Sequence, residues 1–195
     1  MVALLAVAGL RYALPSSLSV GPDWVLAAIV SLMLVPTAFL HRTGRHTANQ
    51  IAGYLVTGVV TADMMVSLGL LITRLPEHKE TPKELLVAAA GLWISNILVF
   101  ASWYWRLDAG GPNARDRREH HHSGAFLFPQ MTLDGGQRWK PGFVDYLFLA
   151  FNTSTAFSPT DVPVLSRWAK VMMMLQATIS LGTVAILAAR AVNVL

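Results

Sequence analysis

The chain has 195 residues, 54% of them hydrophobic and only 13% charged, whereas a soluble domain carries roughly 25% charged residues, so an ordinary water-facing surface is excluded. The absence of cysteine excludes disulfides, thiolate nucleophiles and cysteine metal sites. The net charge of +4 is better explained by basic loops held on the cytoplasmic side of a membrane than by nucleic acid binding.

Long apolar runs separated by charged turns predict helices that cross a membrane. Residues 3–20 predict a short first span rather than a signal peptide, because a basic n-region and a cleavage site are missing. The second span covers residues 24–40 and contains Pro36, which membrane helices tolerate. The third and fourth spans cover residues 50–73 and 84–105.

The fourth span has a clear signal at each end. Thr81 is expected as its N-cap and Pro82 as its first helical residue. Trp103, Tyr104 and Trp105 at the other end are typical of an interfacial aromatic belt.

Residues 106–142 form a polar and basic segment that is predicted to be a cytoplasmic loop. Its run from His120 to His122 is read as solvated loop rather than as a metal site, since adjacent histidines make a weak site at best. The patch Phe126–Pro129 is expected to lie on the bilayer surface.

The C-terminal part contains two apolar segments, residues 143–158 and residues 167–193. The first has 16 residues, or roughly 24 Å as a helix, which is short for a hydrocarbon core of roughly 30 Å. It is therefore either a short span or a re-entrant half-helix.

Asp63 lies in the middle of the third span, where a carboxylate needs a partner or water. Asn96, at a similar depth in the next span, is the expected partner, and Ser67 lies one turn away from Asp63. The pattern fits an ion or proton site, or an Asp that only fixes helix packing.

The last span carries Gln176, Ser180, Thr183 and Arg190 on one helical stripe. Such a stripe either mediates helix packing or lines a cavity. Met172–Met174 beside it is read as apolar filler, because three consecutive side chains point in three directions.

Hydrogen-bonding side chains are densest between Asn152 and Asp161. The hydroxyls either bond back to carbonyls of their own helix or face a water-filled cavity. The chemistry-bearing residues of this stretch are Asn152, Thr153, Ser154, Thr155, Ser158, Thr160 and Asp161.

The last fifty residues contain a dense pattern of residues typical of one protein family: Asp145–Phe148, Ala150, Phe151, Phe157, Thr160, Asp161, Ser166, Arg167, Lys170, Ser180 and the closing Ala191–Leu195. In this pattern the chain resembles the bacterial inner-membrane proteins grouped as domain of unknown function 1345. The resemblance implies a helical membrane protein without an assigned activity, and it transfers no catalytic residue.

A second resemblance is to the pore region of potassium channels. Thr155–Asp161 stands where such a channel carries its filter, after a short aromatic helix and before an inner helix with a basic start. The glycines of such a filter are absent, and Ser158 and Pro159 stand in this stretch instead.

Charge distinguishes the two topologies. Six full spans with a cytoplasmic N-terminus place nine Lys and Arg residues inside and six outside, whereas a re-entrant segment with a cytoplasmic C-terminus gives five inside and ten outside. The sequence therefore predicts one all-α membrane domain of five to six spans, with six spans and two cytoplasmic termini preferred.

The resulting functional hypothesis is a multi-pass protein of the bacterial inner membrane that lets an ion or small solute permeate. We expect it to form a homo-oligomer and to contact membrane lipid. No cofactor or metal is expected. The alternative is a non-enzymatic structural or accessory membrane protein. An enzyme is not expected, because no HExxH or GxSxG motif appears and all six histidines lie in loops. The residues expected in the polar interior are Asp63, Asn96, Asn152, Thr153, Ser154, Thr155, Ser158, Thr160, Asp161, Gln176 and Ser180.

Overall fold

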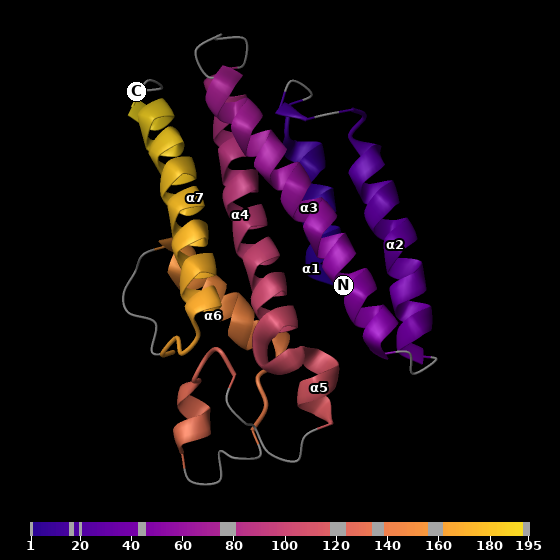
Figure 1. Cartoon of the computed structure of the whole chain (residues 1–195). Helices are drawn as coiled ribbons and strands as arrows, with labels where there is room; N and C mark the ends of the chain where they lie inside the picture. The colour runs from indigo at the N-terminus through magenta and orange to yellow at the C-terminus, as the bar shows by residue number, and fades with distance from the viewer. Residues whose placement is uncertain are drawn as a thin grey trace.

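The computed structural model describes residues 2–15, 18–19, 21–42, 46–74, 81–117, 124–133, 139–155 and 162–192. Across these residues the chain is helical and contains no named strand, which confirms the all-α class (Figure 1). The helices are α1 (Val2–Leu10), α2 (Trp24–Arg42), α3 (His46–Arg74), α4 (Pro82–Leu107), α5 (Pro112–Asp116), α6 (Phe143–Thr155) and α7 (Arg167–Val192).

Three helices, α3, α4 and α7, are long and apolar enough to cross a membrane. The helical stretches Val2–Ala13 and Trp24–Thr37 are apolar but shorter. The membrane character of the chain follows from these helices, while the number of spans stays a prediction.

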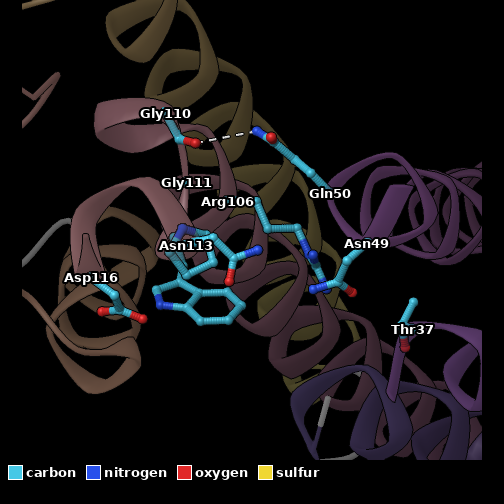
Figure 2. Close-up of a pocket in the computed structure, with 10 residues that line it drawn as sticks. Thr37, Asn49, Gln50, Arg106, Gly110, Gly111, Asn113 and Asp116 are labelled. Atoms are coloured by element: carbon cyan, nitrogen blue, oxygen red, sulfur yellow. Dashed lines mark hydrogen bonds between the residues drawn. The ribbon is translucent and has the colours of Figure 1, made fainter. Parts of the chain in front are cut away.

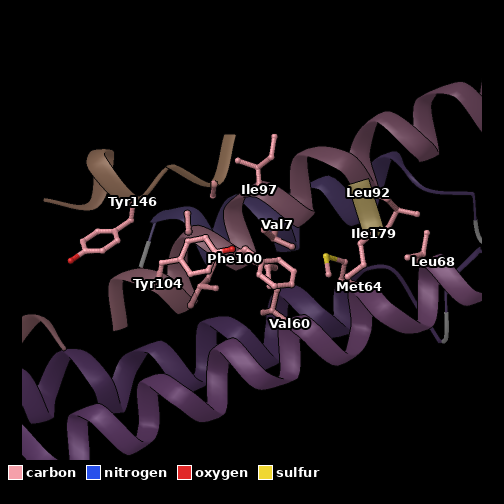
Figure 3. Packing of buried hydrophobic residues seen from close by; sticks show 14 of the residues in the cluster. Val7, Val60, Met64, Leu68, Leu92, Ile97, Phe100, Tyr104, Tyr146 and Ile179 are labelled. Atoms are coloured by element: carbon pink, nitrogen blue, oxygen red, sulfur yellow. The ribbon is translucent and has the colours of Figure 1, made fainter. Parts of the chain in front are cut away.

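Helix α4 lies at the centre of the bundle, with α1, α3, α6 and α7 packed around it. Val7 of α1, Met64 of α3 and Phe100 of α4 belong to one continuous apolar core (Figure 3). Small residues on α4, among them Ala88 and Gly91, are buried and let the neighbouring helices approach closely.

The N-terminus of α4 is capped as the sequence predicts. The amide of Glu84 donates to the Thr81 hydroxyl over 3.2 Å, and the amide of Thr81 donates to Glu84 Oε2 over 2.8 Å. This reciprocal capping box satisfies two of the helix's otherwise unpaired donors.

The segments that precede and follow α6, residues 124–133 and 162–166, lie at the same end of the bundle. Leu127 N donates to Pro163 O over 3.0 Å, and Leu165 N donates to Ala125 O over 2.8 Å, so the segment before α6 pairs with the segment after it. This pairing favours the re-entrant alternative for residues 143–158 over the preferred full crossing, and the course of this segment through the membrane stays a prediction. Helix α6 has 13 residues, about 20 Å, which is shorter than a hydrocarbon core of roughly 30 Å.

The C-terminal end of α6 reaches the middle of its neighbours. The Phe151 ring lies 6.1 Å from that of Trp93, which is eleven residues from the start of α4 and fourteen from its end. Ser154 contacts Gln176, which lies nine residues, or about 14 Å, along α7. The end of α6 therefore lies near mid-depth of the bundle.

A buried carboxylate fixes the start of α6. Asp108 has no exposed surface; its Oδ2 accepts from the Tyr146 hydroxyl over 2.6 Å and its Oδ1 from the amide of Ala125 over 2.5 Å. The Tyr146 hydroxyl therefore donates to a carboxylate that is removed from solvent. Arg115 covers the Tyr146 ring at 5.1 Å and donates to the Asp108 carbonyl over 2.7 Å.

Aromatic side chains of the segment before α6, residues 124–133, pack between α6 and α7. Phe126 and Phe128 are buried, which shows that their expected place on the bilayer surface is wrong. The Phe126 ring lies 6.2 Å from Tyr146 of α6 and 6.1 Å from Trp168 of α7. These contacts hold the starts of the two helices together.

Candidate functional site

The end of α6 is held by one buried glutamine on α7. Gln176 Nε2 donates to the Ala150 carbonyl over 2.7 Å and to the Ser154 hydroxyl over 2.8 Å. Its Oε1 accepts from the Tyr104 hydroxyl of α4 over 2.6 Å. Gln176 therefore connects α4, α6 and α7 at the depth where α6 ends.

Asn96 of α4 extends this network toward the second half of α7. Its Nδ2 lies 3.2 Å from both the Gln176 carbonyl and the Ser180 hydroxyl, and can donate to each. Asn96 is fully buried, and its Oδ1 has no hydrogen-bond donor among the described residues. The expected pairing of Asn96 with Asp63 is wrong, since Asn96 faces α7.

The predicted stripe on α7 is confirmed for the residues that the structure describes. Gln176, Ser180 and Thr183 are all buried, and Thr183 bonds back to the carbonyls of Ile179 and Ser180. The side chain of Arg190 lies outside the described part. This stripe packs helices together within the chain, which is the simpler of the two predicted roles.

The neighbouring methionines do not converge on one point. Met172 and Met173 are half-buried against the core, whereas Met174 is 62% exposed. This arrangement agrees with their interpretation as apolar filler.

The hydroxyls of α6 mostly bond within their own helix. Thr153 donates to the Leu149 carbonyl over 2.8 Å and Thr155 to the Phe151 carbonyl over 3.1 Å. Ser154 joins the Gln176 network, and Asn152 is half-buried. The other candidates of this stretch, Ser158, Thr160 and Asp161, lie outside the described residues.

The polarity of α6 is the chemical feature of the site. Asp145 lies in its first turn and accepts from the amide of Gly142 over 2.7 Å, while no Lys or Arg lies in its last turn. A helix carries a partial negative charge of roughly half an electron at its C-terminus, where the last carbonyls lack amide partners. That end lies near mid-depth of the bundle, so this partial negative charge lies inside the bundle.

Asp63 is paired with Arg11, which sequence reasoning missed. The two side chains form an ion pair between α3 and the short helical turn after α1, with 4% of Arg11 and 23% of Asp63 exposed. The space around the pair, lined in part by Ser67 and Ser95, is about 10 Å³, the lower limit for one water molecule. The pair packs helices and leaves little room for an ion.

No family model, curated protein or solved structure matches the chain. The two resemblances read from the sequence therefore stay predictions, and the function is argued from the geometry alone.

We expect Asp63→Leu to lower thermal stability strongly, by about 3 kcal/mol, because the buried Arg11 guanidinium loses the carboxylate of its ion pair. The double variant Arg11→Leu/Asp63→Leu is expected to recover most of that loss. Thermal unfolding of the purified protein in detergent measures both. A double variant as unstable as the sum of the two single variants would contradict the pairing.

We expect Gln176→Leu to cost roughly 2 kcal/mol, because the Tyr104 hydroxyl and the end of α6 lose their buried partner. Thr178→Val, on the exposed face of the same helix, is the matched control and should change the unfolding temperature little. Equal unfolding temperatures for the two variants would show that the Gln176 contacts do not hold α6.

Proposed function

We propose that the chain is a subunit of a cation-permeation protein in the bacterial inner membrane, with the end of α6 at the permeation path. The observation that supports this most is the half-helix itself. It enters the bundle, ends near mid-depth with its negative end inward, and the chain then returns to the end from which it came.

A half-helix is costly in a membrane unless it has a purpose. Backbone groups at hydrocarbon depth need protein or water as partners. Broken helices whose ends meet at the midplane are the arrangement by which many transporters and channels bind ions. A protein that only packed helices would be served equally well by a full span.

Side chains near this end add polarity without adding positive charge. Thr153 and Thr155 are partly exposed, and a hydroxyl that donates to its own helix still presents an oxygen lone pair. Asn152 supplies an amide oxygen at the same level. These oxygens are ligands suited to hard cations.

One copy supplies one wall of such a path, so we propose a homo-oligomer. Helix α7 leaves a large apolar surface uncovered in the single chain, including Val171, Met174 and Leu181, which are 59%, 62% and 72% exposed. Further copies packed on this surface would bring several α6 ends around one axis. Lipid would cover the remaining apolar faces.

The orientation follows from the basic residues. If α6 is re-entrant, the loop of residues 106–142 (the long loop) and the C-terminus lie on opposite sides of the membrane. The order of the helices along the chain assigns each basic residue to one end of the bundle. Ten of the fifteen Lys and Arg residues then lie at the end with the long loop, and the other five, including Arg11, do not. The positive-inside rule then places the long loop in the cytoplasm and the C-terminus outside. Those ten are Arg42, Arg45, Arg106, Arg115, Arg117, Arg118, Arg138, Lys140, Arg167 and Lys170.

The alternative is a structural or accessory membrane protein. It is favoured by the complete use of Ser154, Gln176 and Ser180 in contacts within the chain. Under this alternative the polar groups only pack helices, and variants at the end of α6 change stability but no flux.

The test is cation flux into liposomes that contain the purified protein, comparing Asn152→Asp with Asn152→Lys. We expect the lysine variant to reduce flux by about tenfold or more, because a cation at the negative end of α6 repels the permeating ion, whereas the aspartate variant keeps or raises flux. Thr73→Val, at the exposed C-terminal end of α3 and away from both α6 and the proposed interface, is the control that should leave flux unchanged.

Wild-type liposomes with no more cation flux than protein-free liposomes would overturn the proposal. So would equal flux in the two charge variants, provided that both unfold at the wild-type temperature. Either result would favour the structural alternative.

A further inference from the structure

A cavity with several polar side chains in its lining lies away from α6, at the end of the bundle where α4 meets α5. It has a volume of about 300 Å³ and lies between the C-terminal half of α2, the start of α3 and the junction of α4 with α5 (Figure 2). Its polar lining consists of Thr37, Asn49, Gln50, Arg106, Asn113 and Asp116, and Trp105 supplies an apolar wall.

Arg106 is the charged group at the centre of this cavity. Its side chain lies against the backbone of α3 so closely that a Cβ on Gly53 would overlap the guanidinium. Its Nε is buried without a hydrogen-bond partner, and no described carboxylate lies within the 4.0 Å of a salt bridge. A half-buried guanidinium that has neither a salt bridge nor a hydrogen-bond partner for its Nε needs an anion or water as its partner.

The groups around Arg106 complete a set of donors. In Figure 2 its side chain extends toward Asn49, and Asn113 lies on the other side of the cavity. Both amides are partly exposed. Gln50 does not add a free donor, because its Nε2 already donates to the Tyr54 hydroxyl over 2.8 Å and to the Gly110 carbonyl over 3.3 Å. Gln50 therefore forms part of the cavity wall.

The one carboxylate in the lining does not neutralise Arg106. Asp116 is exposed, at the rim of the cavity, and its carbonyl accepts from Lys140 Nζ over 2.9 Å. That contact brings a second cation to the rim. The balance of charge around the opening is therefore positive.

We propose that this cavity binds the phosphate group of an anionic membrane phospholipid, with Arg106 as its main ligand and Asn49 and Asn113 as further donors. A guanidinium matches the geometry of phosphate oxygens and donates to two of them at once. The cavity lies beside the last turn of α4, which is long and apolar enough to span a membrane, and next to Trp105. Lipid headgroups lie at the level of such a helix end. The Arg106 side chain stacks on the Trp105 ring at 5.6 Å, which orients it.

The test uses the full chain in neutral detergent, with thermal unfolding followed as lipid is added to the micelles. Phosphatidylglycerol is the probe, diacylglycerol is the matched lipid without phosphate, and glycerol 3-phosphate is the headgroup without acyl chains. We expect phosphatidylglycerol to stabilise the protein, diacylglycerol to have no such effect, and glycerol 3-phosphate to act only at far higher concentration.

The variant Arg106→Gln should weaken the apparent affinity for phosphatidylglycerol by about tenfold or more, since charge-assisted bonds to phosphate are lost. Arg117→Gln, an exposed arginine in the turn after α5, is the control that should keep the wild-type affinity. If Arg106→Gln does not fold, Asn113→Ala tests the same site from its other side and should weaken the affinity as well.

Three results would overturn the proposal. Equal stabilisation by diacylglycerol would mean that the cavity recognises acyl chains only. Stabilisation by glycerol 3-phosphate at the same concentration as lipid would assign the site to a free phosphate compound. Unchanged phosphatidylglycerol affinity in both Arg106→Gln and Asn113→Ala would place the lipid elsewhere.

Discussion

The structure depends on the contact between Gln176 and the end of α6. A half-helix in an apolar interior is stable only if the polar groups at its buried end have partners. The amide of Gln176 supplies two donors to α6 and accepts from Tyr104, so that end is fixed against both α4 and α7. At the other end, Asp108 fixes Tyr146 and the preceding segment. With both ends held, α6 stays at a depth that apolar packing alone would not specify.

Much of the helical framework follows from the sequence, because apolar length and helix caps are local signals. Thr81 and Pro82 mark the start of α4 as predicted, and the Gln176 stripe faces inward as its spacing requires. The sequence leaves the course of residues 143–158 open between a full crossing and a re-entrant half-helix. The deciding contacts are backbone bonds between residues 125–127 and 163–165, which leave no side-chain pattern in the sequence. The distribution of Lys and Arg favours the full crossing over a re-entrant segment only if the C-terminus is cytoplasmic.

The polar interior was predictable in part. Asn96 and Asp63 were paired because both lie near the middle of their spans, but depth does not say which way a side chain faces. The true partner, Arg11, was visible as an isolated cation inside an apolar run, opposite in charge to an isolated anion in another. Asp108 gave no such signal. It begins a Gly-rich stretch typical of a linker, and its role arises from Ala125 and Tyr146, which lie 17 and 38 residues further along the chain.

The most direct test of this account is the side from which the segments flanking α6 can be reached. Leu133 and Leu165 are 67% and 55% exposed, and the chain has no cysteine of its own. Leu133→Cys and Leu165→Cys should react with an impermeant maleimide from the same side of the membrane, and Lys83→Cys at the far end of α4 from the opposite side. Reaction of positions 133 and 165 from opposite sides would show that α6 crosses the membrane, and would contradict the account.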